Sequence, residues 1–119
     1  MPKERNKADG YREKAYEGDT KAMNNLGVCY ERGTGVKVNL EMAFEWYMKA
    51  AELGDVYGCF NVGECYYHGK GVEQNAELAF AGTGVPKDER KGLKWIHKAT
   101  FQGYQPAIDY CKEHGYKWY

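Results

Sequence analysis

The sequence predicts an all-α repeat protein in which helix pairs stack into a solenoid. The first observation is a pattern that returns after 36 positions. It consists of Leu26-Gly27, Tyr30, Gly33-x-Gly35-Val36 and Ala43, and it returns as Val62-Gly63, Tyr66, Gly69-x-Gly71-Val72 and Ala79. The second observation is the helical spacing of apolar residues inside each copy. Because one repeat unit cannot bury its apolar face alone, units stack into an elongated, curved surface.

The first complete unit, residues 19–54, contains two predicted helices. One begins at the N-cap Asp19 and ends at Gly33, and the other begins at the N-cap Asn39 and ends at Gly54. We name them the first-type and the second-type helix. The apolar positions are Ala22, Met23, Leu26, Cys29 and Tyr30 in the first-type helix, and Leu40, Ala43, Phe44, Tyr47, Ala50 and Ala51 in the second-type helix.

Neighbouring segments repeat parts of this plan. Residues 55–68 predict a second first-type helix, which stops at Gly69. Residues 3–18 place Tyr11 and Ala15 where a second-type helix has Tyr47 and Ala51, so this segment predicts an N-terminal capping helix. Both first-type helices contain an internal glycine, Gly27 or Gly63. Since such a glycine costs about 1 kcal/mol relative to alanine, we expect a neighbouring helix to approach closely there.

The last unit is displaced by 49 positions instead of 36, as the match of Trp46 with Trp95 shows. Two interpretations are open: an insertion of 13 residues, or two units that have lost 23. We favour the loss, because residues 73–80 resemble the start of a second-type helix with Asn75 as its N-cap. This predicts a truncated repeat 55–81 that ends in a helical stub at 75–81.

The partial last repeat, residues 82–119, predicts a helix at 88–101 and a final first-type helix at 105–114. Three aromatic residues follow, Tyr116, Trp118 and Tyr119. They either cover the end of the stack or serve as a recognition tail, and we favour the cover because a terminal repeat must hide its exposed core.

The residues of the first unit resemble the Sel-1-like repeat. The matching positions are Ala22, Leu26, Gly27, Tyr30, Gly33, Gly35, Val36, Asn39, Ala43, Trp46, Ala50, Ala51 and Gly54. The resemblance is specific over residues 15–72 and looser over 82–107. It implies a right-handed α/α superhelix, similar to that of tetratricopeptide repeats, which mediates the assembly of protein complexes.

The four cysteines are expected to be reduced and mostly buried. Cys29 and Cys65 occupy equivalent places in adjacent units, roughly 8–10 Å apart, whereas a disulfide requires Cα atoms within about 7 Å. Residues 58–63 also resemble a cysteine-rich secreted branch of the same family, whose second cysteine lies eight positions earlier. Ala51 stands at that position, so the disulfide of that branch cannot form.

Charge and hydropathy exclude two classes of partner. The chain has 17 basic and 17 acidic residues, so it lacks the positive surplus of a protein that binds nucleic acid. No apolar run approaches the roughly 18 residues that a membrane span needs. If Met1 is the natural start, the charged first seven residues predict a protein without an export signal and hence a cytoplasmic location.

An alternative function is a zinc protein or a zinc hydrolase. Two pairs, Cys65 with His68 and Cys111 with His114, have a spacing that puts two metal ligands on one helical face. Cys111 falls at the packing position of Leu26, however, and no further histidine or carboxylate completes a ligand set. We therefore favour a structural role for the four residues and predict no cofactor.

Catalysis has little support in the sequence. The chain contains no serine, and its three histidines lie in different units without a local motif that ties them to a cysteine or an acid. The Gly-x-Gly-Val turns follow helices instead of strands, and no Gly-Lys-Thr or Gly-Lys-Ser follows them, so they are not phosphate cradles. We predict that the protein is not an enzyme.

The predicted function is a non-catalytic adaptor that docks a partner protein or peptide on the concave face of the solenoid. If the first-type helices line that face, the partner contacts Lys21, Asn24, Asn25, Val28, Tyr57, Phe60, Asn61, Glu64 and Tyr67. The aromatic residues among them either contact the partner or fill gaps between units, and the asparagines also suit structural hydrogen bonds. With so few units, self-association through the solenoid ends is a further expectation.

Overall fold

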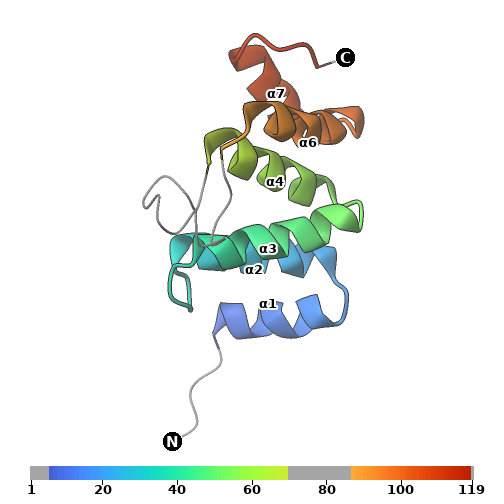
Figure 1. Ribbon diagram of the computed structural model, residues 1–119. Coiled ribbons are helices and arrows are strands. Elements are labelled where there is room, and N and C mark those ends of the chain that lie inside the picture. Colours follow the sequence, from blue (N-terminus) through green and yellow to red (C-terminus); the bar gives the residue numbers. More distant parts are fainter. Residues whose placement is uncertain (1–5, 70–86, 119) are drawn as a thin grey trace, which may run out of the picture.

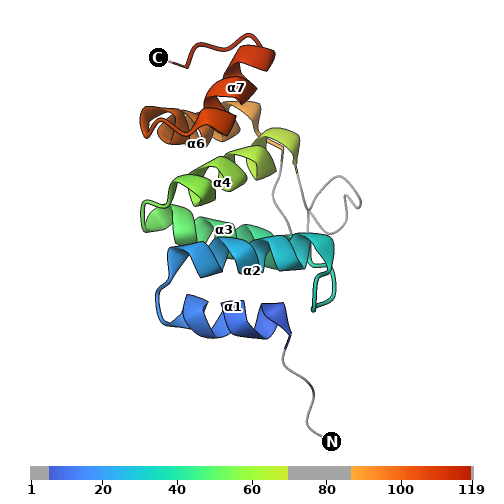
Figure 2. The same ribbon diagram turned by 180° about the vertical axis from the view of Figure 1, so that it is seen from behind.

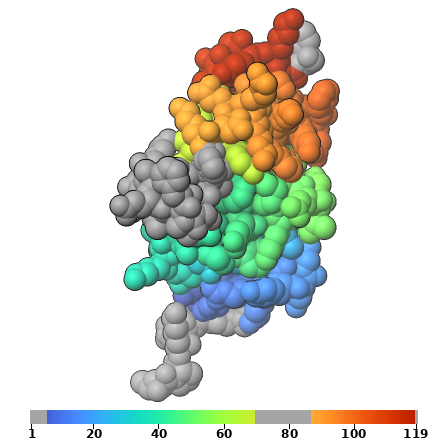
Figure 3. Space-filling view, viewed as in Figure 1, coloured from blue at the N-terminus to red at the C-terminus, as the bar shows by residue number. Residues whose placement is uncertain are grey.

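The computed structural model describes residues 6–69 and 87–118, which form a stack of six helices (Figure 1). The helices are α1 (Lys7–Tyr16), α2 (Thr20–Arg32), α3 (Leu40–Glu52), α4 (Val56–His68), α6 (Glu89–Phe101) and α7 (Gln105–Glu113). No strand occurs among these residues, and the molecule is elongated, with extents of 54 × 35 × 21 Å (Figure 3). The predicted α/α solenoid is confirmed, whereas the stub at 75–81 lies outside the described residues.

Side-chain caps determine where the helices begin. Asp19, Asn39, Asp55 and Asp88 each accept a hydrogen bond at 3.0–3.1 Å from the backbone N–H three residues further on. This bond satisfies one of the amide groups that a helix leaves without a partner at its N-terminus. The starts of α2, α3, α4 and α6 therefore agree with the predicted caps within a residue. In addition, α2 and α4 end at glycines with left-handed backbone, as predicted.

The two types of helix lie on opposite sides of the stack. The second-type helix α3 lies in front of α2 in Figure 1, and the first-type helix α2 lies in front of α3 in Figure 2. The first-type helices α2 and α4 contact each other as well as the α3 helix between them. The candidate interaction residues were predicted on the first-type helices, so they belong to the side of the stack seen in Figure 2.

The helix α6 packs on α4 in the way that α3 packs on α2. The backbone N–H of Asn39 donates to the carbonyl oxygen of Tyr30 at 2.8 Å, and that of Asp88 donates to the carbonyl oxygen of Tyr66 at 2.7 Å. Asp88 follows Gly69 by 19 positions, whereas Asn39 follows Gly33 by 6, so the second connection is 13 residues longer. In packing terms α4 and α6 form one helix pair. The choice between an insertion and a loss concerns residues 70–86, which lie outside the described residues, so the favoured loss stays a prediction.

Each pair crosses at a glycine of the first-type helix. A Cβ atom built on Gly27 would lie 2.5 Å from Cε1 of Tyr47, and one built on Gly63 would lie 2.5 Å from Cγ1 of Ile96. Gly63 also faces Gly92 of α6, whose carbonyl oxygen would lie 2.8 Å from that added atom. The structure therefore shows the close approach of a second-type helix that was predicted as the reason for glycine inside these helices.

The core follows the repeat positions. Leu26, Val62 and Cys111 occupy the same place in α2, α4 and α7, and all three are fully buried. Ala50 and Ala99 do the same in α3 and α6. These residues belong to two clusters, one around α1 to α3 and the other from α3 to α7, and the clusters meet at α3. The apolar face of each pair is thus covered by the next pair.

The end of the stack at α7 is covered by the residues that follow it. Tyr116 and Trp118 pack against the core, and the hydroxyl of Tyr116 lies 3.0 Å from that of Tyr67. The carbonyl oxygen of Lys117 lies 2.9 Å from Nε2 of His97. These contacts support the covering role of the aromatic tail over the recognition role.

None of the helices described here has the length and apolar character that crossing a bilayer requires.

We predict that the substitution Gly63→Ala lowers the free energy of unfolding by about 1–3 kcal/mol, because the new methyl group would overlap backbone atoms of α6. The matched control is Gly10→Ala in α1. Nothing lies within 4 Å of a Cβ at that position. This control is expected to gain up to about 1 kcal/mol from better helix propensity. Urea denaturation followed by circular dichroism measures both values, and equal stability of the two variants would contradict the close approach.

A second prediction concerns Tyr47, whose hydroxyl donates to Oε1 of Glu31 at 3.1 Å. Burial raises the pKa of Tyr47, and the charge of Glu31 raises it further. Because the folded pKa is raised, this stabilisation is complete below the unfolded value of about 10 and is lost as the pH rises above it. Tyr47→Phe should cost about 1 kcal/mol at neutral pH, and its deficit should shrink in alkaline solution. Parallel stability curves from pH 7 to 11 would contradict this assignment.

Candidate protein-interaction surface

The first-type helices α2 and α4 share a hollow of about 210 Å³. We name it the α2–α4 hollow. Its lining residues belong to α2 and α4, and α2 lies in front of α3 in Figure 2. Its lining residues are Lys21, Asn24, Asn25, Val28, Tyr57 and Asn61. All six belong to the nine residues predicted for partner contact, and the structure brings them together from two successive repeats.

Hydrogen bonds of Asn24 hold the floor of this hollow. The side chain is buried, with 6% exposure, and its Nδ2 donates to Oδ1 of Asp55 at 2.7 Å and to the carbonyl oxygen of Thr20 at 3.3 Å. Its Oδ1 accepts from Nδ2 of Asn61 at 3.4 Å. Because Asp55 also caps α4, Asn24 connects α2 to the first turn of α4. Asn24 is therefore a structural residue more than a contact residue.

Other groups of the hollow are open to a ligand. The side-chain amide of Asn25 forms no hydrogen bond with any residue that the structure describes, and the carbonyl of Asn61 accepts none from them. Tyr57 is 49% exposed, and its ring meets that of Tyr104 edge to face at 5.0 Å. Lys21 adds an exposed cation. The hollow thus presents amide groups, an aromatic ring and a positive charge.

The other three predicted residues lie next to α7 instead of in the hollow. Phe60 packs its ring against Tyr104 at 5.6 Å and against Tyr110 at 5.9 Å. Tyr67 contacts Tyr110 at 5.7 Å between ring centroids, in addition to its hydroxyl contact with the aromatic tail. Phe60 and Tyr67 therefore fill the space between α4 and α7, the second of the two interpretations left open for these aromatic residues.

The acid–base state of this aromatic region follows from burial and from Glu64. Burial raises the pKa of Tyr104 and of Tyr110, and the negative charge of Glu64 contributes to both shifts. The hydrogen bond with Tyr116 raises the pKa of Tyr67 to about 12. All three phenols are therefore protonated at neutral pH. They offer ring surface and hydrogen-bond donors, and none of them is a candidate general base.

The four residues of the zinc alternative take part in other contacts. Nε2 of His68 lies 3.1 Å from the hydroxyl of Tyr110, and Nδ1 of His114 lies 2.9 Å from the carbonyl oxygen of Tyr110. The rings of His114 and Tyr110 stack at 4.2 Å. Cys65 and Cys111 are buried. Within the described parts of the chain, no three histidine, cysteine or acidic side chains come together as metal ligands.

The thiol groups lack the character of nucleophiles. All four cysteines are buried and outside disulfides. Burial raises the pKa of Cys29, Cys59 and Cys111, which keeps these thiols protonated, whereas a reactive cysteine needs a lowered pKa and access to solvent. The arrangement is that of small core residues.

Sequence reasoning missed the contribution of α7 to this face of the stack. Tyr110 follows Asn25 by the same 85 positions that separate Ala107 from Ala22, so an asparagine position of α2 carries a tyrosine in α7. The signal is present in the sequence, because Cys111 falls at the packing position of Leu26 at the same offset.

Comparison with known proteins agrees with this architecture. The family model described as Sel1 repeat matches residues 20–55, 56–81 and 80–104. The third match begins before α6, so the family model divides the chain at 80–81, whereas the packing joins α4 to α6. No curated protein matches the chain significantly.

Three solved structures are similar to this one. Helicobacter pylori cysteine rich protein B has a TM-score of 0.67 at 28% identity, with 86% of this chain and 67% of that chain covered. A Sel1 repeat protein from Oxalobacter formigenes has a TM-score of 0.69 at 28% identity, with 87% and 68% covered. The third is c5321, a protective antigen of uropathogenic Escherichia coli strains that displays an SLR fold, with a TM-score of 0.69 at 30% identity; 92% of this chain and only 21% of that one are covered.

The family model matches most of the chain in three successive segments, and the similar structures share the same stack of helix pairs. The chain belongs to the Sel1 repeat family.

Proposed function

We propose that the chain is a non-catalytic adaptor that docks a segment of a partner protein in the α2–α4 hollow. Sel1 repeats are typically protein–protein interaction modules. The observation that carries the proposal is that six predicted contact residues line one hollow, in which the side-chain amide of Asn25 and the side-chain carbonyl of Asn61 are open. An extended peptide carries backbone donors and acceptors that such amides can satisfy.

The hollow suits a peptide more than a small molecule. Its aromatic ring, that of Tyr57, lies in the first turn of α4, and Val28 of α2 supplies a smaller apolar contact. Aromatic residues provide large contact area at low entropic cost, which is why they dominate the energetics of many interfaces. The helix caps and the Asn24–Asp55 bond hold α2 and α4 in place, so little conformational order has to be gained on binding.

The proposal includes the absence of catalysis and a cytoplasmic location. The buried, protonated thiols and the neutral tyrosines supply neither a nucleophile nor a base, and thiols without disulfides suit a reducing compartment.

Self-association stays a prediction. The residues after α7 cover one end of the described stack, whereas α1 at the other end carries a hollow of about 290 Å³ lined by Lys7, Gly10, Tyr11, Glu13 and Lys14.

The adaptor proposal predicts that a partner is lost when the open groups of the hollow are removed. The variant is the double substitution Asn25→Ala and Tyr57→Ala, and the readout is affinity capture from a lysate of the source cell with quantitative mass spectrometry. Loss of an aromatic contact and of an amide should lower recovery of the partner about tenfold or more, since contact residues of this kind contribute about 1–2 kcal/mol each.

The matched control is Phe101→Ala, which removes an exposed aromatic ring, 83% accessible, outside the hollow. Circular dichroism confirms that each variant is folded before capture. A partner that the double variant retains at the wild-type level would place binding elsewhere and refute the proposed hollow. Direct titration of the captured protein with wild type and both variants then gives the affinities.

A further inference from the structure

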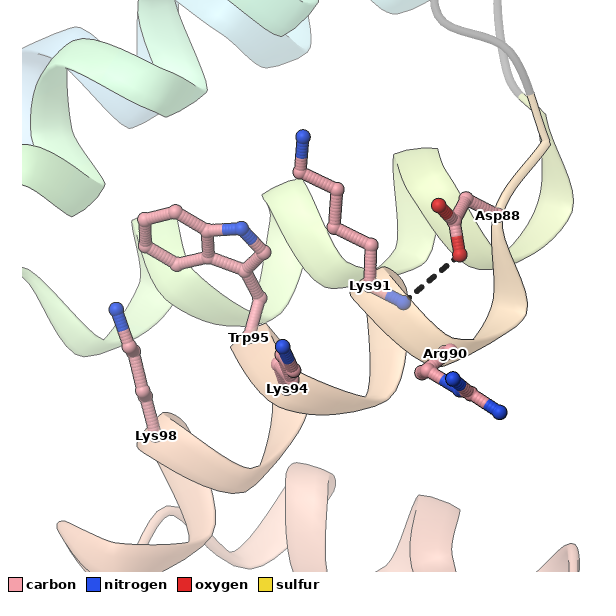
Figure 4. A pocket seen from close by; sticks show the side chains of 6 residues that line it. All are labelled: Asp88, Arg90, Lys91, Lys94, Trp95 and Lys98. Carbon is pink, nitrogen blue, oxygen red and sulfur yellow. Dashed lines mark hydrogen bonds between the residues drawn. The ribbon is translucent and has the colours of Figure 1, made fainter.

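The second-type helix α6 carries a surface with a different chemistry. A hollow of about 330 Å³ follows this helix and is lined by Asp88, Arg90, Lys91, Lys94, Trp95 and Lys98 (Figure 4). We name it the α6 surface. Four of its six side chains are cations and one is a carboxylate, although the whole chain is neutral. The positive charge is therefore concentrated locally, which gives this surface a preference for anionic ligands.

The spacing of these residues places them on one face of the helix. Lys91, Lys94, Trp95 and Lys98 stand at i, i+3, i+4 and i+7, which is one side of an α-helix. Figure 4 shows Lys91, Trp95 and Lys98 on the same side of α6, with Lys94 at the front of the helix in this view. The α6 surface is thus a row of positive charges around the half-buried ring of Trp95.

Contacts among the described residues leave most of this charge uncompensated. The carboxylate of Asp88 accepts the backbone N–H of Lys91 at 3.0 Å and is occupied as the helix cap. The ammonium group of Lys98 lies 4.0 Å from the ring centroid of Trp95, a contact that leaves its charge in place. Arg90 and Lys94 are exposed and form no ion pair or hydrogen bond with any described residue.

The equivalent helix α3 provides an internal comparison. Trp46 and Lys49 of α3 form the same cation–π contact, at 4.3 Å, that Trp95 and Lys98 form in α6. In contrast, the positions of Arg90 and Lys94, 49 residues earlier, carry Glu41 and Glu45. A second-type helix therefore forms with glutamates at these two positions, so the scaffold does not require the cations Arg90 and Lys94.

We propose that the α6 surface binds an acidic, extended segment of a partner protein. Positions one helical turn apart lie about 5–6 Å from each other, and carboxylates at every second residue of an extended chain are about 6.6 Å apart. Arg90, Lys94 and Lys98 can therefore pair with successive carboxylates, while the ring of Trp95 supplies apolar contact between them. The cations extend over only two helical turns of a neutral protein, which fits a short peptide better than a nucleic acid.

This surface is independent of the proposed adaptor site. The α2–α4 hollow and the α6 surface share no residue, and they belong to helices of different type. A partner that spans both would gain affinity from two separate contacts on one rigid stack. Loss of binding at one surface should therefore leave binding at the other surface unchanged.

The test measures fluorescence anisotropy of a labelled ten-residue peptide with glutamate at every second position, and of the same peptide with glutamine instead. The variant is Arg90→Glu with Lys94→Glu, which installs the residues that α3 carries. The matched control is Arg32→Glu with Lys37→Glu, which changes the net charge equally at exposed positions outside the α6 surface. A milder variant, Arg90→Ala with Lys94→Ala, guards against misfolding, and circular dichroism verifies each protein.

We expect wild type to bind the glutamate peptide and not the glutamine peptide, with an affinity that falls as the salt concentration rises. The charge-swapped variant should bind about tenfold more weakly, and the control should stay within about twofold of wild type, since distant exposed charges are largely screened. Absence of binding to the glutamate peptide, or equal losses in variant and control, would overturn the proposal. Tighter binding of a single-stranded oligonucleotide, lost in the charge-swapped variant, would assign the surface to nucleic acid instead.

Discussion

The stack depends on the absence of a side chain where each first-type helix crosses its second-type partner. At Gly27 and Gly63 the partner helix comes so near that even a methyl group would overlap it. Glycine weakens an isolated helix, yet here it lets the large residues Tyr47 and Ile96 become buried almost completely. Burial of such side chains contributes about 1.5–3 kcal/mol each, which exceeds the loss in helix propensity.

The candidate site follows from this packing. Because α3 lies between α2 and α4, its close contacts with both determine the distance between the two first-type helices. Gly27 of α2 faces Tyr47 of α3, and a Cβ atom built on Gly58 of α4 would lie 2.6 Å from the backbone nitrogen of Ala51. Asn24 then fixes their relative position through the cap residue Asp55. Helix α7 is held differently, since its main contacts with α4 are aromatic rings such as Tyr110 against Phe60 and Tyr67. The part of this face at α2 and α4 is therefore held by close backbone packing, and the part at α4 and α7 is held by packing of side chains.

Local signals in the sequence predicted most of the fold and part of the site. Caps such as Asp19 and Asn39, and helix-ending glycines such as Gly33, act within a few residues, so the helix boundaries could be read directly. The separation of Phe60 and Tyr67 from the α2–α4 hollow could not, because it depends on where α7 lies in space. The packing of α6 on α4 could not be read from the sequence either, because it is a contact between helices that a long connection separates.

The buried cysteines make the protein a reporter of its own fluctuations. Every first-type helix contains at least one: Cys29 in α2, Cys59 and Cys65 in α4, and Cys111 in α7. A thiol reagent can reach such a group only when the surrounding helices separate transiently, so the modification rate of each cysteine measures the opening free energy of its own part of the stack. Transient opening of the repeat array can thus be followed helix by helix at the native cysteines, without introducing new ones.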